Sequence, residues 1–229
     1  MENLPNGFTL DLCPGAFPLS TDSIALAGFA KLPKGASILD LGSGCGTLGL
    51  MLCATHSDCT VTGVEIDPIA HETALENAQR NQVQERLHSI CDDVALVPTF
   101  INPGSFRVCI SNPPYFVAGP KSKSHPTARS EDNLSLDTLF SSAAWALRYG
   151  GDFYLVHRPE RLGELFATAV KHSLEPKMLQ LLRHRIGGPI VLVLIQYRKG
   201  AKPGLKWDER YLFEADGSFS PYYKKLYHL

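Results

Sequence analysis

The sequence lacks the features that direct a chain into a membrane or out of the cell. Its 229 residues contain no apolar run approaching the ~18 residues of a membrane-spanning helix. The first twelve residues are acidic and polar, without the basic stretch and following apolar segment of a signal peptide. We therefore expect a cytoplasmic protein that makes no contact with a membrane.

The sequence also lacks a metal-binding pattern. It has six cysteines, but no two of them show C-x-x-C spacing and no set of histidines accompanies them. Structural zinc sites need such spacing, so we expect no metal and interpret the cysteines as buried, reduced thiols. No internal repeat or low-complexity stretch divides the chain. With 44% hydrophobic residues, residues 1–229 are predicted to form a single domain with a sizeable core.

Basic residues are scarce in the first half of the chain. Residues 1–110 carry 5 Lys or Arg and 12 Asp or Glu, whereas residues 111–229 carry 17 and 11. A cationic surface attracts polyanions, so this asymmetry favours a nucleic-acid substrate that lies against the second half. Lysines that merely decorate a solvated face are an equally weighted alternative.

Strand-like and helix-like segments alternate along the chain, which is typical of a parallel sheet with crossover helices. Strands are predicted at Ser37–Asp40, Thr60–Glu65, Leu87–Cys91, Phe106–Ser111, Asp152–His157, Lys177–His184 and Pro189–Arg198. Helices are predicted at Thr47–Thr55, Pro68–Asn81, Leu134–Leu147 and Pro159–His172. Only a short glycine-containing turn separates the last two strands, which indicates an antiparallel hairpin. The predicted fold class is α/β, with a seven-stranded, Rossmann-like, mostly parallel sheet and a C-terminal antiparallel hairpin.

A glycine-rich loop, Asp40-Leu41-Gly42-Ser43-Gly44-Cys45-Gly46, follows the first strand. Glycines let the backbone turn sharply and approach a ligand closely, because no Cβ is in the way. Glu65 ends the second strand, where a carboxylate can accept both hydroxyls of a ribose. Gly44-x-Gly46-x-x-Gly49 also satisfies the G-x-G-x-x-G pattern of nicotinamide dinucleotide enzymes, so a dehydrogenase is an alternative.

Two further carboxylates favour S-adenosylmethionine over a dinucleotide. Asp40, just before the loop, can hold the cationic amino-acid end of this donor but would oppose a pyrophosphate. Asp93 follows the third strand, where it can accept a hydrogen bond from the adenine amino group of the donor. The loop therefore predicts a methyl-donor site.

The motif Asn112-Pro113-Pro114-Tyr115 follows the fourth strand, at the sheet edge that also carries the glycine loop. An aromatic amino nitrogen is a poor nucleophile, because its lone pair is delocalised into the ring. If the Asn112 side-chain oxygen and the Pro113 carbonyl accept its two N–H bonds, the lone pair turns towards the donor methyl. Tyr115 and Phe116 offer stacking faces for a splayed-out base. The motif predicts methyl transfer to a planar amino nitrogen, although taken alone it also fits an ordinary turn.

The whole chain resembles the bacterial tRNA adenine-N6 methyltransferases, which modify the adenine beside the anticodon of a valine tRNA. The stretches that carry the resemblance are Phe17-x-x-Ser20-Thr21-Asp22-Ser23-Ile24-Ala25-Leu26, Leu39–Gly46, Val64–Asp67, Ser111–Phe116, Ala128–Glu131 and Asp216–Ser220. The resemblance implies a class I methyltransferase fold that uses S-adenosylmethionine to methylate tRNA. In that fold residues 1–36 would form an arm and a helix over the cofactor, and residues 37–229 the catalytic core.

The resemblance also implies roles for individual residues. Donor binding falls to Asp40, Gly42, Gly44, Gly46, Glu65 and Asp93, and action on the base to Asn112 and Tyr115. We add Ser43 and Thr21 as candidate donor contacts, Pro113 as a catalytic residue, and Pro114, Phe116 and Arg129 as candidate substrate contacts. Three alternatives stay open. Asp92 can share the role of Asp93. Thr21 and Asp22 can contact the methionine end of the donor, or Ser20 or Asp22 can instead be a helix N-cap. Arg129 can form a surface ion pair instead.

The acceptor is less closely defined than the chemistry. Relatives with the same Asn-Pro-Pro-Tyr motif methylate a glutamine of release factors or bases of ribosomal RNA, so both are alternatives to tRNA. A module that binds RNA without turnover is a non-enzymatic alternative. Residues 118–132 are rich in Gly, Pro, Ser and Lys, and we expect this loop to be mobile without substrate.

Overall fold

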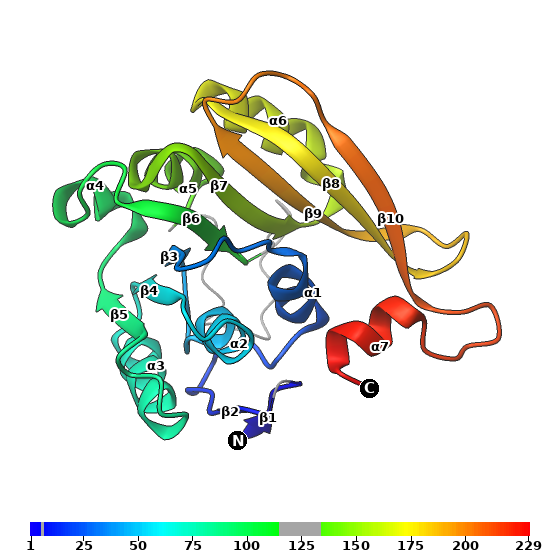
Figure 1. The fold of residues 1–229 in the computed structure, drawn as a ribbon, viewed down its shortest axis with the longest axis horizontal. Coiled ribbons are helices and arrows are strands. Elements are labelled where there is room, and N and C mark those ends of the chain that lie inside the picture. The colour runs from blue at the N-terminus through cyan, green and yellow to red at the C-terminus, as the bar shows by residue number, and fades with distance from the viewer. Residues whose placement is uncertain (6, 115–133) are drawn as a thin grey trace.

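The structure, a computed structural model, describes residues 1–5, 7–114 and 134–229. In these residues an eight-stranded sheet is flanked by helices on both faces (Figure 1). The strand order is β10-β8-β9-β7-β6-β3-β4-β5. The strands are β3 (Ser37–Leu41), β4 (Thr60–Glu65), β5 (Leu87–Cys91), β6 (Phe106–Ser111), β7 (Leu147–His157), β8 (Leu174–Arg185), β9 (Ile190–Lys199) and β10 (Lys206–Phe213).

The sheet is mostly parallel, as predicted. Strands β5, β4, β3, β6 and β7 run in one direction, and β9 lies antiparallel between β7 and β8. The hairpin predicted for the last two strands is therefore confirmed. The strand count of seven was one too low, because β10 adds a parallel edge strand beside β8. Half of the eight residues of β10 are exposed and four are charged. Charge protects a sheet edge, but it also leaves the strand without a recognisable hydrophobic pattern.

Helices cover the two faces of the sheet as separate layers. They are α1 (Thr21–Phe29), α2 (Thr47–Thr55), α3 (Pro68–Arg80), α4 (Val97–Phe100), α5 (Leu136–Ala146), α6 (Leu162–Lys171) and α7 (Pro221–Tyr227). Buried residues of α1, α2, α3 and α7 share one core with alternate residues of the central strands, and those of α4, α5 and α6 share the other. In the described parts of the chain no helix is long and apolar enough to cross a membrane.

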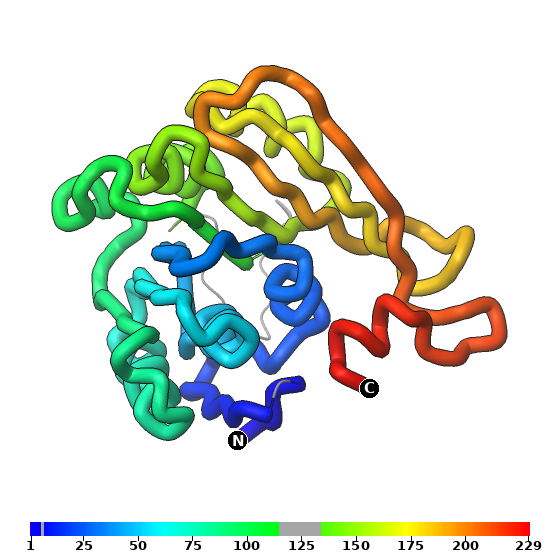
Figure 2. The backbone as a smooth tube through the Cα atoms, in the orientation of Figure 1, coloured from blue at the N-terminus to red at the C-terminus, as the bar shows by residue number. Residues whose placement is uncertain are grey.

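The C-terminal helix α7 packs beside α1, as the red and blue segments show (Figure 2). Leu226 of α7 lies over Gly28, where a Cβ would come within 2.5 Å of the leucine side chain. The hydroxyls of Thr21 and Tyr227 meet at 3.2 Å. The first turn of α1 is thus held by Tyr227, the last residue of α7.

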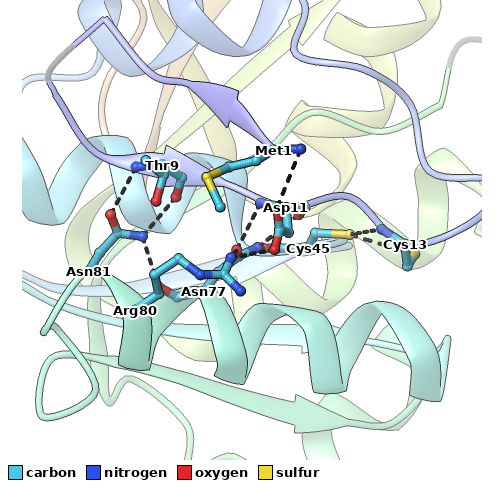
Figure 3. Close-up of polar contacts among 8 residues, drawn as sticks. All are labelled: Met1, Thr9, Asp11, Cys13, Cys45, Asn77, Arg80 and Asn81. Atoms are coloured by element: carbon cyan, nitrogen blue, oxygen red, sulfur yellow. Dashed lines mark hydrogen bonds and ion pairs between the residues drawn. The ribbon is translucent and has the colours of Figure 1, made fainter.

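The N-terminal arm begins with a short antiparallel pair, β1 (Glu2–Asn3) and β2 (Thr9–Leu10). Residues of β2 and of the segment after it are held against α3 (Figure 3). The side chain of Asn81 accepts from the Thr9 N–H and donates to its carbonyl, at 2.9 and 2.7 Å. Asn77, fully buried, makes the same two contacts with the Asp11 backbone and donates to the carbonyl of Cys45 at 3.0 Å. Asn77 therefore joins the arm to the glycine-rich loop.

Candidate active site

A cavity of about 530 Å³ lies at the carboxyl ends of β3, β4 and β6. Its volume is in the range of small-molecule sites. The wall is formed by the N-terminal arm, the first turn of α1, the glycine-rich loop and the segments that follow β4, β5 and β6. Its polar and loop residues include Cys13, Ser20, Asp22, Ser23, Gly42, Ser43, Gly44, Glu65, Asp67, Asp93, Asn112, Pro113 and Pro114. Segments distant in sequence thus converge on one hollow.

The glycine-rich loop holds a conformation that depends on its glycines. Gly42, Gly44 and Gly46 have φ angles of +75°, +54° and +82°. These left-handed values strain other residues, and a Cβ built on Gly44 would meet nothing within 4 Å. The N–H groups of Gly42 and Ser43 donate to the Val64 carbonyl at 2.9 and 3.1 Å. The loop is therefore anchored to β4 while leaving open space above Gly44.

Glu65, at the end of β4, braces the same loop. Its side chain is 7% exposed. One carboxylate oxygen accepts from the Gly44 N–H at 2.9 Å, and the other accepts from the Asp67 N–H at 2.8 Å. A carboxylate has about four lone-pair positions, so these two bonds leave it capacity to accept from a ligand hydroxyl.

Asp40 lies beneath the loop and does not line the cavity. It is 1% exposed, and neither carboxylate oxygen has a hydrogen-bond partner in the described residues. Burial, together with the charge of Glu65, raises the pKa of Asp40 to about 8. The contact between Asp40 and the donor ammonium that the sequence suggested stays a prediction. Because its pKa is raised, Asp40 lies under the loop as a protonated carboxyl group without a hydrogen-bond partner in the described residues.

Replacing Asp40 by Asn should change how stability depends on pH. The pKa of Asp40 is about 8 in the folded protein, raised from 3.8. The contribution of Asp40 to the free energy of unfolding is therefore complete below pH ~4 and is lost as pH rises to ~8. Asp40→Asn carries no titratable group there. Thermal denaturation of the donor-free protein at pH 5 and 8.5 should show a smaller decrease in Tm for the variant than for the wild type.

Asp216→Asn is the matched control for that experiment. Asp216 is exposed, and its hydrogen bonds to Ser218 lower its pKa, so its effect falls below pH ~4 and outside the tested window. If the decrease in Tm between pH 5 and 8.5 were the same in Asp40→Asn as in the wild type, a protonated, buried Asp40 would be contradicted.

Ser43 packs tightly against Gly63 of β4. A Cβ added at Gly63 would lie 2.7 Å from the Ser43 Cβ and still closer to its hydroxyl. Gly63→Ala must therefore push the glycine-rich loop, and we expect donor affinity to fall about tenfold, or roughly 1.4 kcal/mol. Isothermal titration with S-adenosylmethionine measures this. Gly163→Ala in α6 is the control, since its Cβ would meet nothing within 4 Å; equal affinities for both variants would contradict the expectation.

The structure distinguishes the two acids that follow β5. Asp93 lines the cavity, and one of its oxygens accepts from the Ala95 N–H at 2.8 Å as an N-cap. Asp92 does not line it, and its side chain accepts from the Asp93 N–H at 2.7 Å. Asp93 therefore has the better position for a ligand contact, with Asp92 holding its backbone.

Asn112, Pro113 and Pro114 line the cavity after β6, the strand that pairs with β3 and so lies beside the start of the glycine-rich loop. The Asn112 Nδ2 donates to the hydroxyl of Ser23 at 2.9 Å. Sequence reasoning gave Ser23 no role, although it lies in the segment Ser20–Leu26 that carried the family resemblance. Only folding brings these residues, 89 positions apart, together.

The other candidates are placed differently. Ser20 is the N-cap of α1, and Asp22 lies in the first turn of that helix. The hydroxyl of Thr21 faces Tyr227 and does not line the cavity, whereas Asp22 does. Tyr115, Phe116, Arg129 and the loop 118–132 lie outside the described residues. Among the residues that are described, no three His, Cys, Asp or Glu side chains converge as a metal site would require.

The chain is similar in sequence to known methyltransferases. The family model called methyltransferase small domain matches residues 23–172. A tRNA1(Val) (adenine(37)-N6)-methyltransferase from Shewanella halifaxensis is 34% identical over 169 residues, which cover 73% of this chain and 68% of the relative. The protein of the same name from Bacteroides fragilis (strain ATCC 25285) is 30% identical over 184 residues, or 80% and 77% of the two chains.

A solved structure shares the fold. It is a predicted O-methyltransferase from Agrobacterium tumefaciens, with a TM-score of 0.76 and coverage of 91% of this chain and 96% of that one. The two sequences are 22% identical, so this likeness concerns the arrangement of helices and strands.

Proposed function

Because the chain belongs to the methyltransferase small domain family and, within it, to the tRNA1(Val) adenine-N6 methyltransferases, we propose that it methylates the N6 amino group of an adenine in tRNA with S-adenosylmethionine. One observation carries the proposal. A glycine-rich donor loop and an Asn-Pro-Pro segment, which follow the neighbouring strands β3 and β6, line a single cavity. A nicotinamide enzyme does not need the Asn-Pro-Pro segment.

The donor fits the groups present. Open space above Gly44 admits the ligand, and Glu65 can accept from its ribose hydroxyls. Asp93 is placed to accept from its adenine amino group. Asp22 reaches the cavity from α1 and provides negative charge that a cationic donor needs. Asp40, below the loop, adds to this charge when its carboxyl group ionises. S-adenosylmethionine, when bound, supplies an electrophilic methyl group.

Asn112 and Pro113 activate the acceptor. The Asn112 side-chain oxygen and the Pro113 carbonyl each accept one N–H of the adenine amino group, which draws its lone pair out of the ring. Pro113 and Pro114 restrict the backbone, so the Pro113 carbonyl is in place before the substrate arrives. The methylated nitrogen becomes cationic and acidic and loses its proton without a strong general base. Tyr115 and Phe116 stack on the base, and Arg129 contacts phosphate.

Charge supports RNA as the acceptor, since residues 111–229 carry 17 basic and 11 acidic residues. Transfer of labelled methyl groups to purified tRNA and, in parallel, to release factor tests the proposal. We expect label in tRNA from a cytoplasmic extract of a strain that lacks the modification. Label in release factor alone would instead establish glutamine methylation, and label in ribosomal RNA alone would establish an rRNA enzyme.

A further inference from the structure

Ser23 occupies a fixed position in the first turn of α1. Its N–H donates to the side chain of Ser20, the N-cap of the helix, at 3.4 Å. The hydroxyls of Thr21 and Tyr227 meet on another side of the same turn. Ser23 is 8% exposed and lines the cavity. The turn is thus held at two points, and the Ser23 hydroxyl is held with it.

The hydroxyl of Ser23 is the acceptor for the Asn112 amide, with the Nδ2 atom 2.9 Å from the Ser23 Oγ. A carboxamide has an oxygen on one side and an NH₂ group on the other, and a half-turn about its last torsion exchanges them. If the amide turned over, N–H donors would face the N–H donors of the adenine. Catalysis by Asn112 therefore requires a group that keeps its NH₂ on the side away from the base.

We propose that Ser23 is a positioning residue that holds the NH₂ group of Asn112, so that the Asn112 oxygen faces the acceptor amino group. The proposal rests on the function proposed above. Ser23 acts through Asn112 and need not touch either substrate. Because the pair is partly shielded from solvent, water is a poor replacement for the lost hydroxyl.

Ser23→Ala tests this role in the full-length protein. We expect kcat for tRNA methylation to fall about tenfold, the loss of ~1.4 kcal/mol from the transition state. The Kd for S-adenosylmethionine and the Tm should stay close to the wild-type values. Ser142→Ala is the matched control, because Ser142 is also buried and its hydroxyl donates to the Val94 carbonyl at 2.8 Å; its kcat should not change.

A double-mutant cycle separates positioning from a general structural effect. In single-turnover assays with excess enzyme, Ser23→Ala should cost nothing further in an Asn112→Ala background, since Ser23 acts only through Asn112. Equal losses in both backgrounds would overturn the proposal, as would a full kcat in Ser23→Ala. A lowered Tm with weakened donor binding would also overturn it. Absence of tRNA methylation by the wild type would instead contradict the proposed function.

Discussion

Asn112→Ala should abolish most methyl transfer while leaving donor binding intact. The variant loses the side-chain oxygen that accepts one N–H of the acceptor amino group, an interaction that strengthens as charge develops on the nitrogen. Removal of one such preorganised group costs on the order of 10²- to 10³-fold in kcat. The side chain of Asn112 lines the cavity and donates to Ser23 of α1 rather than to Glu65, which braces the glycine-rich loop, so we expect donor affinity to stay close to that of the wild type.

Single-turnover rates and isothermal titration check this expectation together. Asn102→Ala is the control, because Asn102 is an exposed asparagine in the turn before β6. A similar loss of rate in both variants, or loss of donor affinity in Asn112→Ala, would show that Asn112 does not act on the acceptor.

Glu65→Ala should have the largest effect on donor binding. The carboxylate accepts from the N–H groups of Gly44 and Asp67 at 2.9 and 2.8 Å, and both bonds are lost in the variant. Hydrogen bonds to a charged group contribute about 1.5–3 kcal/mol each. The glycine-rich loop loses its brace, and the ribose loses its acceptor. We expect the Kd for S-adenosylmethionine to rise about a hundredfold, or ~2.7 kcal/mol.

Isothermal titration measures the Kd, with Glu76→Ala as the control. Glu76 is an exposed glutamate of α3, away from the cavity wall. If Glu65→Ala bound the donor as tightly as Glu76→Ala, the ribose-binding role of Glu65 would be wrong.

The parallel part of the fold could be read from the sequence because its strands are short apolar segments with clear boundaries. The predicted ranges Thr60–Glu65, Leu87–Cys91 and Phe106–Ser111 coincide with β4, β5 and β6. Strand β7 begins five residues earlier than predicted, at Leu147, where Gly150 and Gly151 interrupt the strand pattern. Strand β10 was missed because it is a charged edge strand and therefore lacks the apolar pattern by which the other strands were predicted.

The sequence could predict which residues belong to the candidate site, but not how deeply each is buried or which side chains contact one another. Motif spacing indicated that the glycine-rich loop and Asn112 share one edge of the sheet. It could not show that Asp40 lies beneath the loop, because burial depends on packing from all sides. It could not pair Ser23 with Asn112 either, since that contact depends on how α1 packs. The roles of the individual site residues stay predictions until the variants are measured.

The central claim is transfer of a methyl group from S-adenosylmethionine to the N6 atom of an adenine in tRNA. Its most direct test uses a donor with a deuterated methyl group, unmodified total tRNA and nucleoside mass spectrometry of the digested product. The account predicts deuterated N6-methyladenosine with the wild-type protein and a hundredfold or greater reduction in its rate of formation with Asn112→Ala. Deuterium in a different nucleoside, or none in tRNA from a protein that binds the donor, would contradict it.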